Sequence, residues 1–311
     1  MLVRRRTEYP RSRQQQQRHQ RRCQRQFQSR TASPRTPQRL DCLIPPQIWQ
    51  IMLPKSGSSG PIEPGNLQDT ASWLALNPDF NYTLVGAEGA QLLMQENTLY
   101  HPQAQRAFEE LQNVGMKSDL LRYSLLHTHG GVYTDTDTVA IKGIREWIPP
   151  YLRDQVRLVV GIEFDRRDGG MWADISHWVQ FCQWTIAAAP GHPVFETMVA
   201  RVLSSVAELT NGTDGQKAVA DLHPSSFEVM NSTGPAAWTD VVFEHLQAFD
   251  PSLNTTKDLS FLKEPTLFGD ILVLTIDGFG MGQPHSHSTN DGSIPSAALM
   301  RHLFRGSWRG D

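Results

Sequence analysis

The sequence predicts an α/β fold built on a mostly parallel sheet, and two features of the chain support this. Short apolar segments alternate with longer segments whose apolar residues recur at helical spacing, an order typical of α/β domains. The central stretch at 130–138, GGVYTDTDT, combines a helix stop, a short strand and two carboxylates. With 311 residues the chain is long enough to bury a sizeable core.

The first half of the domain is predicted from apolar patterns and from the turn residues between them. Pro45 and Pro46 lead into an apolar run, and a Gly/Ser/Pro loop follows at 55–66. Gly130 and Gly131 are a typical helix stop. We expect strands at 43–51, 81–85 and 132–134 and helices at 70–76, 87–96, 102–112 and 117–127.

The second half is predicted in the same way. Residues 157–163, RLVVGIE, read as a buried strand, and Trp178, Phe181 and Trp184 have a helical spacing that favours a core helix over a cofactor site. We expect strands at 139–141, 157–163 and 271–276 and helices at 177–188, 193–209, 235–249 and 296–304.

The N-terminal arm, residues 1–40, differs in composition from the rest. It holds twelve of the 29 basic residues and only one of the 32 acidic residues, and it is rich in Gln. We expect it to be disordered, because it has too few apolar residues to bury. Its charge suits nucleic acid or an anionic membrane, but no nucleic-acid-binding motif follows, so no nucleic-acid partner is expected. A solvated tail or a wrongly assigned start are the other interpretations.

The remaining composition leaves the compartment open. Three cysteines form neither a metal pattern nor a disulfide framework, and no transmembrane anchor or secretory signal is visible in the sequence. Acceptor sequons for N-glycosylation at Asn81, Asn211, Asn231 and Asn254 are compatible with a secretory lumen.

Asp135 and Asp137 are the candidate metal ligands. In an extended segment side chains alternate, so both carboxylates project to the same side, where they repel unless a cation lies between them or one is protonated. Oxygen ligands at a sheet edge suit Mn²⁺ or Mg²⁺ and leave positions for substrate phosphates. The pattern alone also fits a solvated loop, but its place after a helix and a strand favours a site, since ligands bind at that edge of α/β sheets.

Six groups of residues occur in an order that carries a resemblance. They are IPPQIWQ at 44–50, KSDLLRY at 117–123, GGVYTDTDT at 130–138, FCQWT at 181–185 with PGHP at 190–193, TGP at 233–235 with WTD at 238–240, and GSW at 306–308. Together they resemble glycosyltransferase family 32, and within it the fungal initiation-specific α-1,6-mannosyltransferases.

The resemblance implies a GT-A fold over residues 41–311, a single Rossmann-like domain that binds a sugar nucleotide with a divalent metal. It implies that Asp135 reaches the donor and the metal and that Asp137 ligates the metal. Asp119 and Arg122 match a helix motif that contacts the donor, although from the residues alone they also fit a surface ion pair. Tyr133 in the same group of motifs is expected to bind substrate.

Further site residues also follow from the resemblance. His302 matches a His-x-x-Gly ligand segment and is expected as the third metal ligand, with His285 and His287 as rivals. Glu163 and Asp240 are expected to orient the acceptor hydroxyl or the donor sugar, Asp240 as a catalytic residue unless it only pairs within its helix.

The function that the resemblance implies is metal-dependent, retaining transfer of mannose from GDP-mannose in α-1,6 linkage to an N-glycan core. Trp49, in the first motif, is expected to bind substrate. The resemblance also implies a Golgi location and membership of a mannosyltransferase complex. Two alternatives stay open, a family 32 transferase acting on a glycolipid such as inositol phosphorylceramide, and a catalytically silent protein that binds a sugar nucleotide or a glycan.

Overall fold

The structure is a computed structural model that describes residues 42–54, 67–97, 102–172, 175–211 and 217–305. The predicted arm at 1–40, the predicted loop at 55–66 and the motif at 306–308 lie outside the described residues. Within the described part, no helix is long and apolar enough to cross a membrane.

The central feature is a seven-stranded sheet in the order β2-β1-β3-β8-β5-β10-β9. Five of its strands run in one direction, and β8 and β9 run in the opposite direction, which confirms the predicted mostly parallel α/β sheet. The strands are β1 (Gln47–Ile51), β2 (Asn81–Val85), β3 (Gly131–Thr134), β5 (Leu158–Val160), β8 (Thr185–Ala188), β9 (Thr266–Phe268) and β10 (Ile271–Val273).

Two small antiparallel ladders flank this sheet. In the first, β4 (Thr138–Ala140) pairs with β11 (Met300–His302), and in the second, β6 (Ile162–Asp165) pairs with β7 (Val179–Phe181). The first ladder joins segments that lie more than 150 residues apart in the sequence. It therefore brings the C-terminal region to the central stretch of the chain.

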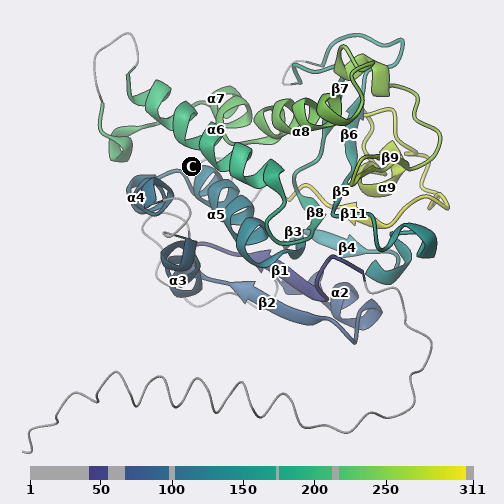
Figure 1. Cartoon of the computed structure of the whole chain (residues 1–311), viewed down its shortest axis with the longest axis horizontal. Coiled ribbons are helices and arrows are strands. Elements are labelled where there is room, and N and C mark those ends of the chain that lie inside the picture. The colour runs from purple at the N-terminus through teal and green to yellow at the C-terminus, as the bar shows by residue number, and fades with distance from the viewer. Residues whose placement is uncertain (1–41, 55–66, 98–101, 173–174, 212–216, 306–311) are drawn as a thin grey trace, which may run out of the picture. The chain divides into compact units, whose positions relative to one another are not determined.

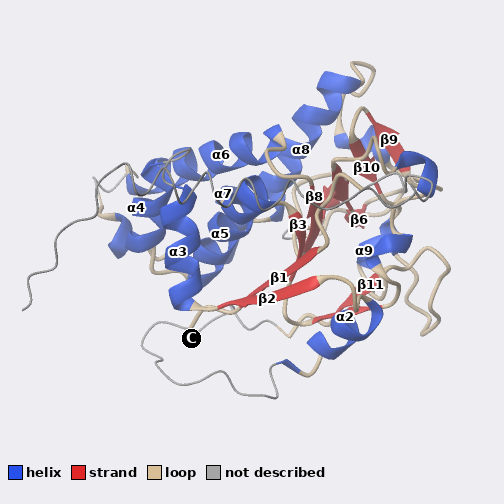
Figure 2. Ribbon diagram, turned by 60° about the horizontal axis from the view of Figure 1, so that its bottom comes forward, coloured by secondary structure: helices blue, strands red, loops and turns tan. Residues whose placement is uncertain are grey.

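Helices cover both faces of the main sheet, as Figures 1 and 2 show. The larger group lies on one side, and α2 and α9 lie on the other. The helices are α2 (Thr70–Leu76), α3 (Ala87–Asn97), α4 (Pro102–Glu110), α5 (Val114–His129), α6 (Pro193–Thr210), α7 (Ser226–Ser232), α8 (Pro235–Phe249) and α9 (Ile276–Gly280).

The hydrophobic core is divided by the sheet into two clusters. Because side chains alternate along a strand, Val132 packs into the cluster around Trp73 and Phe279, while Tyr133 packs into the cluster around Trp238. Burial on both faces explains why the central strands are almost continuously apolar.

Two predicted helices are wrong. Residues 177–188 form β7 and β8, because this apolar segment is buried between strands and helices on all sides, where periodicity cannot separate helix from strand. Residues 296–304 contain β11 instead of a helix, because Met300–His302 pairs with β4, a tertiary contact that overrides local propensity.

The predicted strand at 157–163 is two strands, interrupted at Gly161. A Cβ atom at Gly161 would lie 2.7 Å from side-chain atoms of Phe279, so α9 packs closely against the chain at this point. The other predicted helices and strands occur within a few residues of their expected bounds.

Candidate active site

The two glycines before β3 fix the direction in which the chain leaves α5. Gly130 (φ 63°) donates its N–H to Leu126 O at 3.0 Å, and Gly131 follows with φ 98°. Both conformations lie in the left-handed region that favours glycine. A Cβ atom on Gly131 would lie 2.7 Å from Gln47 O in β1, so the strands could not approach as they do.

Asp135 and Asp137 lie in the tight turn between β3 and β4, not in the extended strand that the sequence suggested. The turn is held by main-chain contacts of Asp135, whose N–H donates to Trp184 O at 2.8 Å and whose carbonyl accepts from Gln50 Nε2 at 3.0 Å. Thr138 Oγ1 donates to the same carbonyl at 2.6 Å.

A buried chain of threonine hydroxyls lies directly behind this turn. Thr134 Oγ1 is 2.7 Å from Thr138 Oγ1 and 2.8 Å from Thr185 Oγ1, and all three residues are fully buried. Buried hydroxyls with complete partners restrict the backbone to one conformation. The alternating threonines of the motif therefore position the carboxylates.

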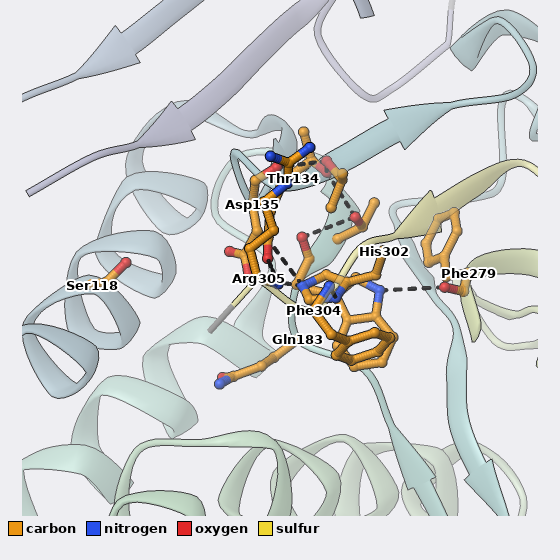
Figure 3. Close-up of polar contacts among 12 residues, drawn as sticks. Ser118, Thr134, Asp135, Gln183, Phe279, His302, Phe304 and Arg305 are labelled. Atoms are coloured by element: carbon orange, nitrogen blue, oxygen red, sulfur yellow. Dashed lines mark hydrogen bonds and ion pairs between the residues drawn. The ribbon is translucent and has the colours of Figure 1, made fainter. Parts of the chain in front are cut away.

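His302 from β11 completes a three-residue cluster with the two acids (Figure 3). Its Nε2 is 3.3 Å from Asp137 Oδ1 and 3.7 Å from Asp135 Oδ2. One ligand atom from each of the three residues lies within 4.8 Å of the others. Two carboxylates and an imidazole at this separation are a ligand set that fits a divalent cation.

The orientation of His302 is set by its neighbours. The ring lies 4.8 Å from the Trp184 ring and 4.0 Å from the Phe304 ring, and the Phe304 N–H donates to its Nδ1 at 3.0 Å. Trp184 is itself fixed, since its indole N–H donates to Phe279 O at 3.3 Å. These contacts direct Nε2 toward the carboxylates.

The segment after β11 also holds Asp137. The N–H of Leu303 donates to Asp137 O and the N–H of Arg305 donates to Asp137 Oδ2, both at 2.9 Å. The Arg305 side chain forms an ion pair with Asp69 at 2.7 Å, next to α2. The segment after β11 therefore covers the Asp137 carboxylate. Asp135 is the more exposed of the two acids, with a side chain that is 28% exposed.

The charges in the cluster perturb each other. Burial would lower the pKa of His302, but its bonds to Asp135 and Asp137 outweigh burial and raise the pKa to about 9. Burial would raise the pKa of Asp137, but the contact with His302 holds it below its usual value. Both pKa shifts have the same cause, the attraction between the His302 ring and the two carboxylates.

Asp119 and Arg122 on α5 form a buried ion pair beside this cluster, which rules out the surface pair among the two sequence interpretations. Arg122 Nη2 is 3.1 Å from Asp119 Oδ1 and 3.6 Å from Asp135 Oδ1, and the side chains are only 7% and 5% exposed. Burial raises the pKa of Asp119 to about 6, although the charge of Arg122 opposes this. Arg122 thus links the two acids.

Tyr133 and Trp49 pack against the site residues and the glycine turn. Tyr133 is 1% exposed, and its hydroxyl donates to Asp135 Oδ1 at 2.5 Å, while the guanidinium of Arg122 lies 4.6 Å from its ring centroid. Trp49 donates its indole N–H to Gly130 O at 2.9 Å. Tyr133, expected to bind substrate, thus contacts Asp135 and Arg122, and Trp49, also expected to bind substrate, contacts Gly130.

The other expected site residues are not members of the three-residue cluster. Glu163 is buried in β6, with Gln180 Nε2 3.4 Å from its carboxylate. Asp240 in α8 pairs with His177 Nε2 at 2.8 Å. His285 stacks on Trp172 at 4.8 Å, and within the described residues the one group placed to hold a metal contains His302, not His285 or His287.

Two residues that sequence reasoning did not single out complete the pair on α5. Gln183 Nε2 donates to Asp119 Oδ1 at 3.2 Å, and its carbonyl accepts from Arg122 Nη1 at 3.0 Å. Thr233 Oγ1 donates to Asp119 Oδ2 at 2.6 Å. Both residues occur in the motifs FCQWT and TGP, but spacing alone does not show which helix they face.

Residues 66–154 match the model of a family described as "Glycosyltransferase sugar-binding region containing DXD motif". The chain is 34% identical to a protein from Schizosaccharomyces pombe and 31% identical to one from Candida albicans, each named "Initiation-specific alpha-1,6-mannosyltransferase". Both alignments cover 86% of this chain, and they cover 64% and 73% of the respective relatives.

Among solved structures, one titled "PaToxG Glycosyltransferase" is similar to this chain. It has a TM-score of 0.43 at 19% identity, and the match covers 67% of this chain and 72% of that one.

Proposed function

Since the chain belongs to the glycosyltransferase family with the DXD-containing sugar-binding region, we propose that it transfers mannose from GDP-mannose in α-1,6 linkage to an N-glycan core. Its α/β fold with a mostly parallel sheet agrees with the GT-A fold that the family resemblance implies. The observation that carries the proposal is the cluster of Asp135, Asp137 and His302 directly beside the buried pair of Asp119 and Arg122.

The geometry supports a division of work among these residues. Asp135, Asp137 and His302 are the residues that would hold Mn²⁺, with Mg²⁺ as the alternative. The cation supplies Lewis-acid stabilisation of the diphosphate that leaves. We propose that Asp119 and Arg122, which burial and Gln183 hold in place, contact the donor sugar or nucleotide.

The stereochemical proposal is retention. The donor and the product are both α-linked, and we assign no carboxylate as a nucleophile. The acceptor hydroxyl therefore attacks the anomeric carbon on the face from which GDP departs, through an oxocarbenium-like state, and its proton passes to the departing diphosphate as the bond to GDP breaks. Electrostatic stabilisation in a preorganised site is the main contribution that the chain's own residues make to such a step.

The cellular setting is part of the proposal. Two relatives named "Initiation-specific alpha-1,6-mannosyltransferase" support the linkage and the sugar. From the family resemblance we further propose a glycan on a glycoprotein as the acceptor, the Golgi lumen as the location and a mannosyltransferase complex as the assembly. Subcellular fractionation and co-purification with tagged protein test the last two points.

The direct test is turnover of a panel of sugar nucleotides by the full chain with Mn²⁺, with Mg²⁺ and with EDTA. We expect GDP-mannose to be used in the presence of metal, and Asp137→Asn to lose at least about a hundredfold in rate, since loss of one charged ligand in a site of this kind costs several kcal/mol. His285→Ala is the matched control and should keep wild-type activity. Use of another donor would overturn the mannose assignment, and binding without turnover would favour a silent sugar-nucleotide-binding protein.

A further inference from the structure

A groove separate from the three-residue cluster of Asp135, Asp137 and His302 lies between α8, the segment that leads into β7 and the segment at 255–257. Its volume is about 450 Å³, within the range of small-ligand sites. The lining side chains that matter here are His177, Trp178, Asp240, Phe243, Glu244 and Lys257.

The walls of this groove are held in place before any ligand arrives. His177 Nε2 lies 2.8 Å from Asp240 Oδ1, and its Nδ1 lies 3.2 Å from Ser176 Oγ. The Trp178 ring is flanked by Lys257 Nζ at 4.4 Å and by the guanidinium of Arg166 at 4.5 Å. A wall with fixed rotamers loses little conformational entropy on binding.

The chemistry of the lining favours a neutral, polyhydroxylated ligand. Asp240 and Glu244 supply negative charge and Lys257 and His177 supply donors, so no strong field of one sign selects an anion. The Asp240 side chain is 54% exposed and keeps acceptor capacity beyond its bond to His177. Hydroxyl groups, which both donate and accept, match such a mixture, and the partly buried Phe243 offers an apolar surface to the C–H groups of a sugar.

Both walls connect, through one short element each, to Asp119, which lies beside the three-residue cluster. Trp178 precedes β7 and Gln183 follows it, so an extended chain of five residues, at most about 17 Å, separates the groove from a residue that binds Asp119. On the other wall, Asp240 lies in α8, and Thr233 just before α8 also binds Asp119.

We propose that this groove binds the distal sugar units of a neutral oligosaccharide acceptor whose terminal unit reacts at the three-residue cluster. The inference rests on the proposed function, because it assigns the acceptor side of that reaction. It makes Asp240 and Glu244 residues that determine acceptor length, not residues that act on the donor.

The experiment compares wild type with Asp240→Asn and Glu244→Ala on neutral manno-oligosaccharides of increasing length. Both positions lie on the exposed face of α8, so neither change disturbs the core. In wild type we expect kcat/KM to rise with acceptor length. In the variants we expect KM for the longer acceptors to rise roughly tenfold or more, as loss of a hydrogen bond to a charged group does, while mono- and disaccharide acceptors are unaffected. Glu208→Ala, on the exposed side of α6, is the control.

A second readout uses no donor. Saturation-transfer NMR with a manno-oligosaccharide should detect binding to wild type and weaker binding to both variants. If wild type binds the oligosaccharide in this way but does not use GDP-mannose, the proposed function fails while the groove assignment stands. Equal length dependence and equal binding in wild type and variants would overturn the assignment. Binding of a glycopeptide but not of its free glycan would also overturn it, in favour of a peptide-binding groove.

Discussion

Removal of the Arg122 charge is expected to destabilise the folded protein. Arg122→Met keeps the unbranched stem of the side chain but removes the guanidinium, which leaves Asp119 buried without its ion-pair partner. It also removes the hydrogen bond to Gln183 O and the contact with the Tyr133 ring. Breaking a buried pair in this way costs about 3–5 kcal/mol of unfolding free energy, because the remaining charge is uncompensated.

The pH dependence identifies the cause of that loss. In the folded protein the pKa of Asp119 is raised from 3.8 to about 6, mainly by burial, so its ionised form opposes folding by about 3 kcal/mol at pH 7. This cost is complete above pH 6 and disappears as pH falls toward 4. Without Arg122 the pKa rises further, so the variant gains about 1.4 kcal/mol per pH unit already from pH 7 downward. The difference between wild type and variant should therefore shrink by about 1.4 kcal/mol between pH 7 and pH 5.

The assay is urea denaturation followed by fluorescence at pH 5, 6 and 7. A second variant carrying both Arg122→Met and Asp119→Asn should recover about half of the loss at pH 7, because no buried charge remains and the amide can still bond to Thr233. A loss below about 1 kcal/mol at pH 7, or a difference that does not change with pH, would show that the pair is not buried and coupled as described.

Three further outcomes are expected. Mn²⁺ at a hundred times its dissociation constant should stabilise wild type by about 2.7 kcal/mol in thermal unfolding, and this gain should be lost in His302→Ala and kept in His285→Ala. Gly131→Ala should lower the unfolding free energy measured in urea by at least about 2–4 kcal/mol, since φ is 98° and the Cβ would lie 2.7 Å from a backbone carbonyl of β1. Gly89→Ala is the control, inside α3 with an ordinary 3.5 Å contact, and should raise it by up to about 1 kcal/mol. Thr134→Val should cost about 1 kcal/mol, because it removes the hydroxyl that contacts Thr138 and Thr185 while both of these keep their bonds to main-chain carbonyls, and no loss would show that the hydroxyl chain adds little.

The position of the site could be predicted from sequence because its main residues are close together in the chain. Gly130 and Gly131 must end a helix, and the strand after them must be short, so Asp135 and Asp137 fall at the edge of the sheet whatever the rest of the fold is. The local geometry was less predictable. The acids lie in a turn instead of an extended strand, and this depends on hydroxyl contacts with Thr185, which is 50 residues away.

The surroundings of the site could not be predicted from local patterns. His302 reaches the acids through the ladder of β11 and β4, and the same segment carries a helical pattern that gave a wrong prediction. The family resemblance predicted His302 as a metal ligand, whereas the apolar periodicity predicted a helix where the structure has β11. A helix was also wrongly predicted at 177–188, where the structure has β7, a turn and β8. The contact between Gln183 and Asp119 of α5 could not be predicted from a helix, because it depends on this strand-turn-strand arrangement.

The balance of charge explains why these groups belong together. The described cluster joins three carboxylates, Asp119, Asp135 and Asp137, to two cationic groups, Arg122 and His302. Burial makes each unpaired charge costly, and the raised pKa of Asp119 shows that Arg122 does not fully compensate it. A fold that needed only stability would gain by replacing such a group with apolar side chains. The threonine chain, the glycine turn and the C-terminal segment instead hold the excess negative charge in one place, an arrangement that becomes favourable when a divalent cation offsets the charge and exposes a positive position to a diphosphate.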